Sequence, residues 1–211
     1  MIRRALPVAA LLVALVAAGP AEAVVDAKRK RAPTCKRKRS KTVRQNSAAR
    51  VFQKAAGDRT RRYGCLKRRG KSIRLDEAYD DGYVMSTSYR EVRLAGRFVA
   101  WEDVSTDVSC KADCPPGYNP ETTSIDVYDL ARRRQVSYDG TVLNESLVLT
   151  RRGSVAWLQR TSPGIDVEVH IGEGSTRRLL DRGNVDPDSL RLTGNTVFWT
   201  KDGAERSSPI R

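Results

Sequence analysis

The sequence has 211 residues, enough for one domain of ordinary size around one hydrophobic core. It carries 39 Lys and Arg against 25 Asp and Glu, a formal net charge of +14, with a hydrophobic fraction of 39%. Residues 24–75 hold 20 Lys/Arg against two Asp, whereas residues 76–211 hold 17 Lys/Arg against 22 Asp/Glu. This asymmetry excludes an evenly basic protein and indicates a basic N-terminal region on a near-neutral body.

Residues 1–23 have the three parts of a secretory signal peptide: two arginines near the start, an apolar stretch, and Ala21-Glu22-Ala23 as a cleavage site. The alternative is a membrane anchor, but the apolar stretch at residues 5–18 is shorter than the roughly 20 residues that span a bilayer. We therefore expect a secreted or cell-envelope protein that begins at Val24 and has no transmembrane segment after cleavage.

Residues 24–44 are dominated by clusters of positive charge. Charge this dense cannot be buried, so we expect a disordered or loosely attached arm before a single all-β domain at residues 45–211. Outside the cell its partner would be an anionic envelope polymer or another envelope protein, with no specific nucleic acid. The alternative is a solvated extension with no partner. The residues expected to bind a polyanion are Lys28, Arg29, Lys30, Arg31, Lys36, Arg37, Lys38, Arg39 and Lys41.

Three alternating runs between residues 49 and 75 indicate strands separated by glycine turns. The next segment, Asp76–Gly82, is rich in acidic residues but lacks the ligand spacing of a calcium loop, so we expect a solvated turn. Residues 83–89 then indicate a strand that leads to the first of three similar hairpins.

The three hairpins share one sequence pattern, found at Arg93–Trp101, Leu149–Trp157 and Arg191–Trp199. In each, an alternating run meets a glycine turn, and a second run carries a valine two residues before the tryptophan. Valine and tryptophan then share one face of a strand, and the glycine permits the tight turn of a β-hairpin. We expect these tryptophans, Trp101, Trp157 and Trp199, at equivalent buried positions in successive units, as the core of the repeat.

Further alternating segments follow the first two hairpins at residues 125–130 and 165–171, each with a basic run behind it. Four short antiparallel strands per unit are typical of a β-propeller blade. The tryptophans are 56 and 42 residues apart, and the longer interval contains an insertion at Cys110–Pro120. The sequence thus predicts an all-β fold of about three to four propeller-like units, with the N-terminal strands completing the last one. A β-sandwich is the alternative, because short alternating strands fit it as well.

Four cysteines in an exported chain predict two disulfides, for which three pairings are possible. Cys110 and Cys114 lie four residues apart and would staple their loop, so that Cys35 would pair with Cys65. Zinc is the competing interpretation, but the chain has neither C-x2-C pairs nor a Cys/His set at finger spacing. We expect no metal and no cofactor.

No motif of a familiar catalytic chemistry occurs in the sequence, which has no G-x-S-x-G elbow, P-loop, dinucleotide fingerprint or H-E-x-x-H pattern. His170, the single histidine, alternates with its apolar neighbours and is expected on the solvent face of a strand. Carboxylates such as Asp103, Asp107 and Asp126 could form a hydrolytic pair, although the sequence selects none of them. We therefore expect a protein that is not an enzyme. The rival is a secreted carboxylate-based hydrolase of polysaccharides.

The hairpin pattern, followed by Ser124–Leu130, resembles the repeats of secreted bacterial β-propellers of the Tol-system, WD40-like type. In those repeats a V-x-W strand often precedes a strand ending in D-L, and the Asp202-Gly203 turn is similar to their DG turns. The resemblance covers about residues 90–211, with fewer units than the four to eight blades of typical propellers. It implies an exported binding or structural protein of the cell envelope.

Overall fold

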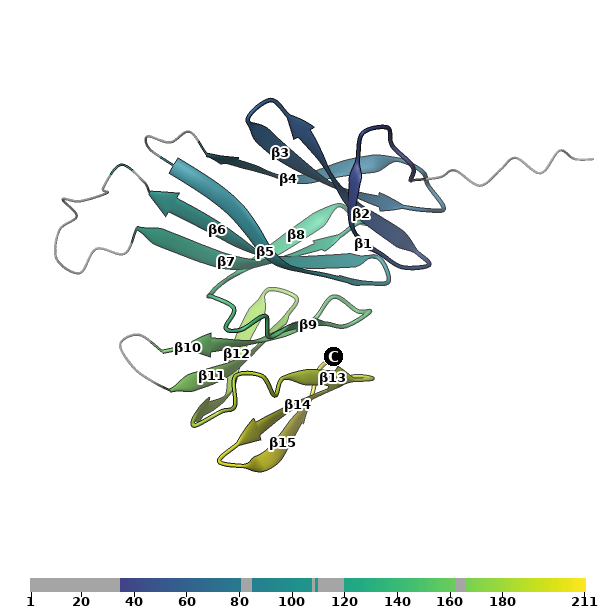
Figure 1. The fold of residues 1–211 in the computed structure, drawn as a ribbon. Helices are drawn as coiled ribbons and strands as arrows, with labels where there is room; N and C mark the ends of the chain where they lie inside the picture. Colours follow the sequence, from purple (N-terminus) through teal and green to yellow (C-terminus); the bar gives the residue numbers. More distant parts are fainter. Residues whose placement is uncertain (1–34, 81–84, 108, 110–119, 162–165) are drawn as a thin grey trace, which may run out of the picture. The chain divides into compact units, whose positions relative to one another are not determined.

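The computed structural model describes residues 35–80, 85–107, 109, 120–161 and 166–211 as an all-β chain (Figure 1). These residues contain no helix, and hence none long and apolar enough to cross a membrane. The first strands are β1 (Lys41–Gln45), β2 (Ala49–Ala56), β3 (Arg59–Leu66) and β4 (Ser72–Asp80). A second group is β5 (Met85–Ala95), β6 (Phe98–Asp107), β7 (Glu121–Asp129) and β8 (Arg134–Asp139). A third is β9 (Leu147–Leu149), β10 (Val155–Arg160), β11 (Val167–Glu173) and β12 (Thr176–Gly183). The last is β13 (Arg191–Thr193), β14 (Thr196–Lys201) and β15 (Ala204–Pro209).

Strands that follow one another within a group pair antiparallel. β1–β8 form one sheet, and among the described residues the strand pairs that join its halves are Tyr79 with Thr87 and Asp80 with Ser86. The halves are therefore two four-stranded units, followed by the four-stranded sheet β9–β12 and the three-stranded sheet β13–β15. The predicted fold class is confirmed as an all-β chain with antiparallel four-stranded units. The arrangement fits a propeller-like or a sandwich fold.

The repeated sequence pattern forms the β5–β6, β9–β10 and β13–β14 hairpins. Their turn glycines, Gly96, Gly153 and Gly194, have φ angles of +58°, +95° and +59°. Only glycine adopts this backbone region without steric cost, so the spacing of the glycines sets where each hairpin turns.

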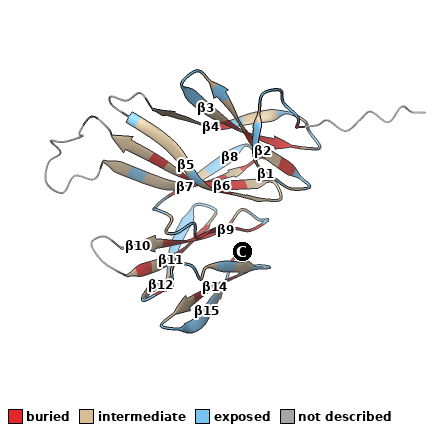
Figure 2. Cartoon of the chain, viewed as in Figure 1, coloured by how far each residue is buried: buried red, intermediate tan, exposed pale blue. Residues whose placement is uncertain are grey.

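The three tryptophans lie between successive units, with exposures of 0%, 0% and 5% (buried residues are red in Figure 2). Trp101 belongs to a buried cluster with residues of β2 and β3, Trp157 to one with residues of β7 and β8, and Trp199 to one with residues of β10 and β11. The residue before each of the first two tryptophans faces the other side of its sheet. Ala100 therefore packs in the cluster with the third unit, and Ala156 packs in the cluster with the fourth. Both faces of the second and third units are thus covered, because each of these two units packs against the one before it and the one after it.

The N-terminal boundary differs from the expected one at residue 45. Lys41–Gln45 is an edge strand paired with β2, and Cys35 is buried and joined to Cys65 with a Cα–Cα distance of 5.8 Å. The predicted Cys35–Cys65 disulfide is confirmed, whereas Cys110 and Cys114 lie outside the described residues. A strand forms despite the charge because the charged side chains of β1 stay exposed while Val43 packs against the core.

Two further expectations about this region are wrong. The acidic segment that begins at Asp76 is strand β4 as far as Asp80, not a turn; residues 81 and 82 lie outside the described residues. The N-terminal strands also do not complete the last unit, since β13–β15 takes no strand from the described N-terminal part. The reason is that β1–β4 already contains four strands, which pair among themselves and leave none to donate.

Candidate functional site

A strongly basic hollow lies at the hairpin turns of the first three units. In an antiparallel four-stranded unit, the turn between the first two strands and the turn between the last two lie at the same end. Two adjoining pockets of about 410 and 760 Å³ form there, and they share a wall of Arg97, Phe98, Arg132 and Arg152. We call them together the basic groove, whose cations are Lys67, Arg68, Arg97, Arg132, Arg134, Arg151 and Arg152.

Hydrogen bonds between the turns hold the groove together. Arg69 of the β3–β4 turn donates from Nη1 to the carbonyl oxygen of Ala131 in the β7–β8 turn, at 3.1 Å. Asn46 of the β1–β2 turn donates from Nδ2 to the carbonyl oxygen of Gly96 in the β5–β6 turn, also at 3.1 Å. The first and second units therefore present their turns side by side, and a fixed backbone carries the charged side chains.

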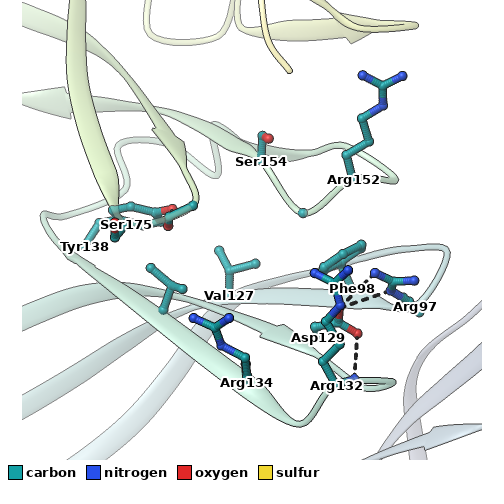
Figure 3. Close-up of a pocket in the computed structure, with 13 residues that line it drawn as sticks. Arg97, Phe98, Val127, Asp129, Arg132, Arg134, Tyr138, Arg152, Ser154 and Ser175 are labelled. Atoms are coloured by element: carbon teal, nitrogen blue, oxygen red, sulfur yellow. Dashed lines mark hydrogen bonds and ion pairs between the residues drawn. The ribbon is translucent and has the colours of Figure 1, made fainter.

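Among the described residues, Asp129 is the single carboxylate that lines the two pockets, and Figure 3 shows it in the smaller one. Its Oδ2 lies 3.1 Å from Nε and 3.0 Å from Nη2 of Arg97, and 4.0 Å from Nε of Arg132. Its Oδ1 accepts the backbone N–H groups of Ala131 and Arg132 at 2.8 and 3.2 Å. Asp129 thus shapes the β7–β8 turn and orients Arg97 at the boundary of the two pockets, while the groove keeps a large excess of positive charge.

The smaller pocket also has an apolar side, formed by Phe98, Val127, Val136 and Tyr138. The Arg97 guanidinium lies over the Phe98 ring, 4.8 Å from its centroid. Gly153 lies so close that a Cβ at this position would come within 2.6 Å of the ring. The glycine of the β9–β10 hairpin thus permits the third unit to approach Phe98, and that approach completes the pocket.

The predicted arm residues are only partly described. Lys28–Arg31 lie outside the described residues, whereas Lys36–Arg39 are exposed just before β1. Arg37 donates from Nη2 to the carbonyl oxygen of Gly70 at 2.6 Å and from Nε to Ser72 Oγ at 3.0 Å. Gly70 belongs to the same β3–β4 turn as Lys67 and Arg68 of the groove, so Arg37 anchors the described part of the arm to that turn.

Sequence reasoning missed the basic groove because residues 76–211 carry a small net negative charge overall. A usable signal was present in the position of the arginines. They recur beside the turns at Arg97, at Arg132–Arg134 and at Arg151–Arg152, where side chains of separate units can converge.

A second cluster brings together three carboxylates from different strands. Asp76 of β4, Asp103 of β6 and Asp126 of β7 each place a carboxylate oxygen within 4.8 Å of the other two. Burial raises the pKa of Asp103 to about 8, and a hydrogen bond and the charge of Asp76 add to the effect. Burial also raises the pKa of Asp126, although Ser137 and Gln135 donate hydrogen bonds to it. At neutral pH the cluster therefore holds at least one proton.

Arg62 supplies a compensating positive charge beside the carboxylates. It is 4% exposed, and its Cζ lies 3.9 Å from the centroid of the Tyr89 ring. Burial lowers the pKa of Arg62 to about 10, against the opposing influence of Tyr89, Asp76 and Asp103. Carboxylate oxygens are ligands for hard cations, but here a guanidinium already occupies the role of counter-charge.

The carboxylate cluster also bears on the hydrolase alternative. Two of the three aspartates that the sequence suggested, Asp103 and Asp126, do come together, whereas Asp107 at the end of β6 hydrogen-bonds Ser109 instead. Neither pocket of the basic groove is lined by these residues. The geometry favours a proton-sharing structural cluster.

The expectation that His170 lies on a solvent face is wrong, since the residue is 4% exposed. It pairs across the strands with Trp157 and stacks on its ring, with 5.3 Å between centroids. Its Nε2 lies 2.8 Å from Glu168 Oε2, and burial lowers the His170 pKa while that carboxylate opposes the shift. The face is buried because the neighbouring unit covers it through Tyr138, whose ring lies 5.9 Å from that of Trp157.

No protein-family model matches the sequence, and no curated protein matches it. Dipeptidyl peptidase 4 of Porphyromonas gingivalis is similar at 13% identity and a TM-score of 0.49, over 74% of this chain and 28% of that one. TolB of Acinetobacter baumannii is similar at 14% identity and a TM-score of 0.30, over 76% and 40%. An uncharacterized protein of Listeria monocytogenes is similar at 8% identity and a TM-score of 0.31, over 82% and 67%. The chain spans less than half the length of the first two. All three likenesses are loose.

Proposed function

We propose that this chain is a non-enzymatic binding protein that acts outside the cytoplasm and holds anionic polymers in the basic groove. The observation that carries the proposal is the charge of the groove, where turns of three successive units contribute seven cations. The one carboxylate of the lining, Asp129, is already bonded to Arg97. A chain with repeated negative charges would neutralise the excess and release its counterions, which drives such binding.

Two other features support this reading. The Cys35–Cys65 disulfide is typical of proteins that mature in an oxidising compartment, as the expected signal peptide requires. Lys36–Arg39 would extend the positive surface from the groove toward the start of the folded part. The N-terminal arm is then an addition to the groove and not the sole polyanion site.

The test removes charge from the groove without touching the Asp129 pair. The groove variant changes Arg68, Arg134 and Arg151 to Gln. The control changes Lys54, Arg160 and Arg206 to Gln, so that it loses the same charge from other surfaces of the domain. On an anionic column, we expect the groove variant to elute at clearly lower salt than the control, because up to three phosphate-type contacts are lost and each contributes about one unit to the salt slope.

The contribution of the arm is measured separately by deleting residues 24–31. Deletion through Arg44 is unsuitable, because it would remove Cys35 and most of β1. Far-UV circular dichroism checks that each variant keeps its fold. Equal elution of the groove variant and the control would overturn the proposal, and a loss confined to the deletion would assign binding to the arm alone.

A further inference from the structure

The two pockets of the basic groove differ in chemistry, and the difference identifies the kind of ligand. Within the described part of the chain, the pocket of about 760 Å³ is lined by six Lys and Arg and by no carboxylate. The pocket of about 410 Å³ combines an arginine rim with the apolar side chains of Phe98, Val127, Val136 and Tyr138. Its volume falls in the range of pockets that hold small organic groups. The lining therefore suits a chain in which charged groups alternate with compact uncharged parts.

The aromatic rings of the smaller pocket are already engaged by the protein. Phe98 carries the Arg97 guanidinium over its ring and contacts Gly153. Tyr138 is 4% exposed, packs against Gly172, and donates its hydroxyl to the Gly174 carbonyl at 2.6 Å. Single-stranded nucleic acids bind largely by stacking bases on free aromatic faces. These two residues leave no such platform, so a base would gain little here.

On the basis of the proposed function, we propose that the groove binds a non-aromatic acidic chain, a glycan or polyol that bears phosphate or carboxylate groups. One uncharged unit lies in the smaller pocket against Val127 and Val136, where the hydroxyl of the exposed Ser175 lines the wall. The flanking oxyanions contact the arginines of the rim and of the larger pocket, since a guanidinium pairs well with either phosphate or carboxylate.

The experiment compares three probes of equal charge at one ionic strength: poly(glycerol phosphate), oligogalacturonate and oligo(dT). Binding to the chain that starts at Val24 is measured by isothermal titration calorimetry. We expect at least one of the first two probes to bind about fivefold or more tightly than oligo(dT), because stacking is missing. The one that binds more tightly identifies phosphate or carboxylate as the preferred oxyanion.

Two neutral substitutions locate the subsite. Ser175→Leu narrows the smaller pocket without changing charge, and Ser207→Leu, on exposed strand β15, is the matched control. We expect Ser175→Leu to weaken the preferred acidic chain about fivefold, as loss of one well-packed contact does, and to leave oligo(dT) and the control unchanged.

The possible failures are distinguishable. Oligo(dT) binding as tightly as both other probes, or Ser175→Leu having no effect, would overturn this inference. If the groove variant Arg68→Gln, Arg134→Gln, Arg151→Gln still lost affinity, the proposed function would survive. If that variant bound every probe like its control, the proposed function itself would fail.

Discussion

Replacing Asp103 by Asn should stabilise the protein at alkaline pH. The Asp103 carboxyl faces Asp76 and Asp126, and Arg62 lies on the same side. Burial raises the pKa of Asp103 from its ordinary value of 3.8 to about 8. Between these values Asp103 holds a proton in the folded chain and has lost it in the unfolded chain. The folded state then binds more protons, so the free energy of unfolding falls as pH rises through this window and levels off above it.

The size of the effect follows from that window. At about 1.4 kcal/mol per pH unit, the interval from 3.8 to about 8 sets an upper limit of roughly 6 kcal/mol for Asp103. Partial exposure and the hydrogen bond with Asp76 reduce the measurable part to about 1–3 kcal/mol. Asparagine has nearly the same shape and does not titrate, so Asp103→Asn removes the penalty at high pH and changes little at low pH.

The assay is urea unfolding of the wild type and Asp103→Asn at about pH 5 and about pH 8.5. Most of the pH range in which the folded and unfolded chains differ in the protonation of Asp103 lies between these two values. Asp58→Asn is the control, because its side chain is 76% exposed in a turn. We expect the variant to gain clearly more stability over the wild type at the higher pH than at the lower one, and the control to show no such difference. Equal differences at the two pH values would refute the reasoning.

Two further predictions concern single structural features. Changing both Cys35 and Cys65 to Ser should lower the free energy of unfolding by roughly 3–4 kcal/mol, the entropy of closing a loop of this length, as measured by urea unfolding. Reducing agent should then destabilise the wild type far more than the variant. Gly153→Ala should destabilise the chain by about 2–4 kcal/mol, because it combines a φ of +95° with a Cβ 2.6 Å from the Phe98 ring. Gly203→Ala, with φ +76° and open space around the Cβ, should show the backbone cost of about 1 kcal/mol alone; equal losses in the two variants would contradict the clash.

Much of the fold follows from local sequence patterns. The hairpins at Trp101, Trp157 and Trp199 form where glycine spacing and two-residue alternation place them. Cysteine spacing also predicts the Cys35–Cys65 disulfide. Cys110 and Cys114 are close enough in sequence to be predicted as one pair, which leaves Cys35 and Cys65 as the other. Lys41–Gln45 was missed as a strand because only one of its residues packs against the core, and pairing with β2 supplies the rest.

The candidate site could not be predicted in the same way. His170 alternates as a solvent-facing residue should, yet the next unit covers that face. Asp76, Asp103 and Asp126 come from three strands, and only the packing of the first two units brings them within 4.8 Å. Overall charge indicated the arm alone, because the arm is the most basic segment by sequence, whereas the groove draws its cations from turns far apart in the chain.

The sequence by itself determined the strands, the turns and the repeating unit, because backbone conformation and side-chain alternation depend on residues a few positions apart. Only the tertiary structure decided what the units do together. Stacking buries both faces of the second and third units, and it aligns the turns at one end of the first three units. Arg97, Arg132 and Arg152 then face the same hollow although up to 55 residues separate them. Such a hollow depends on how the units pack, and a local sequence pattern contains no information about that packing.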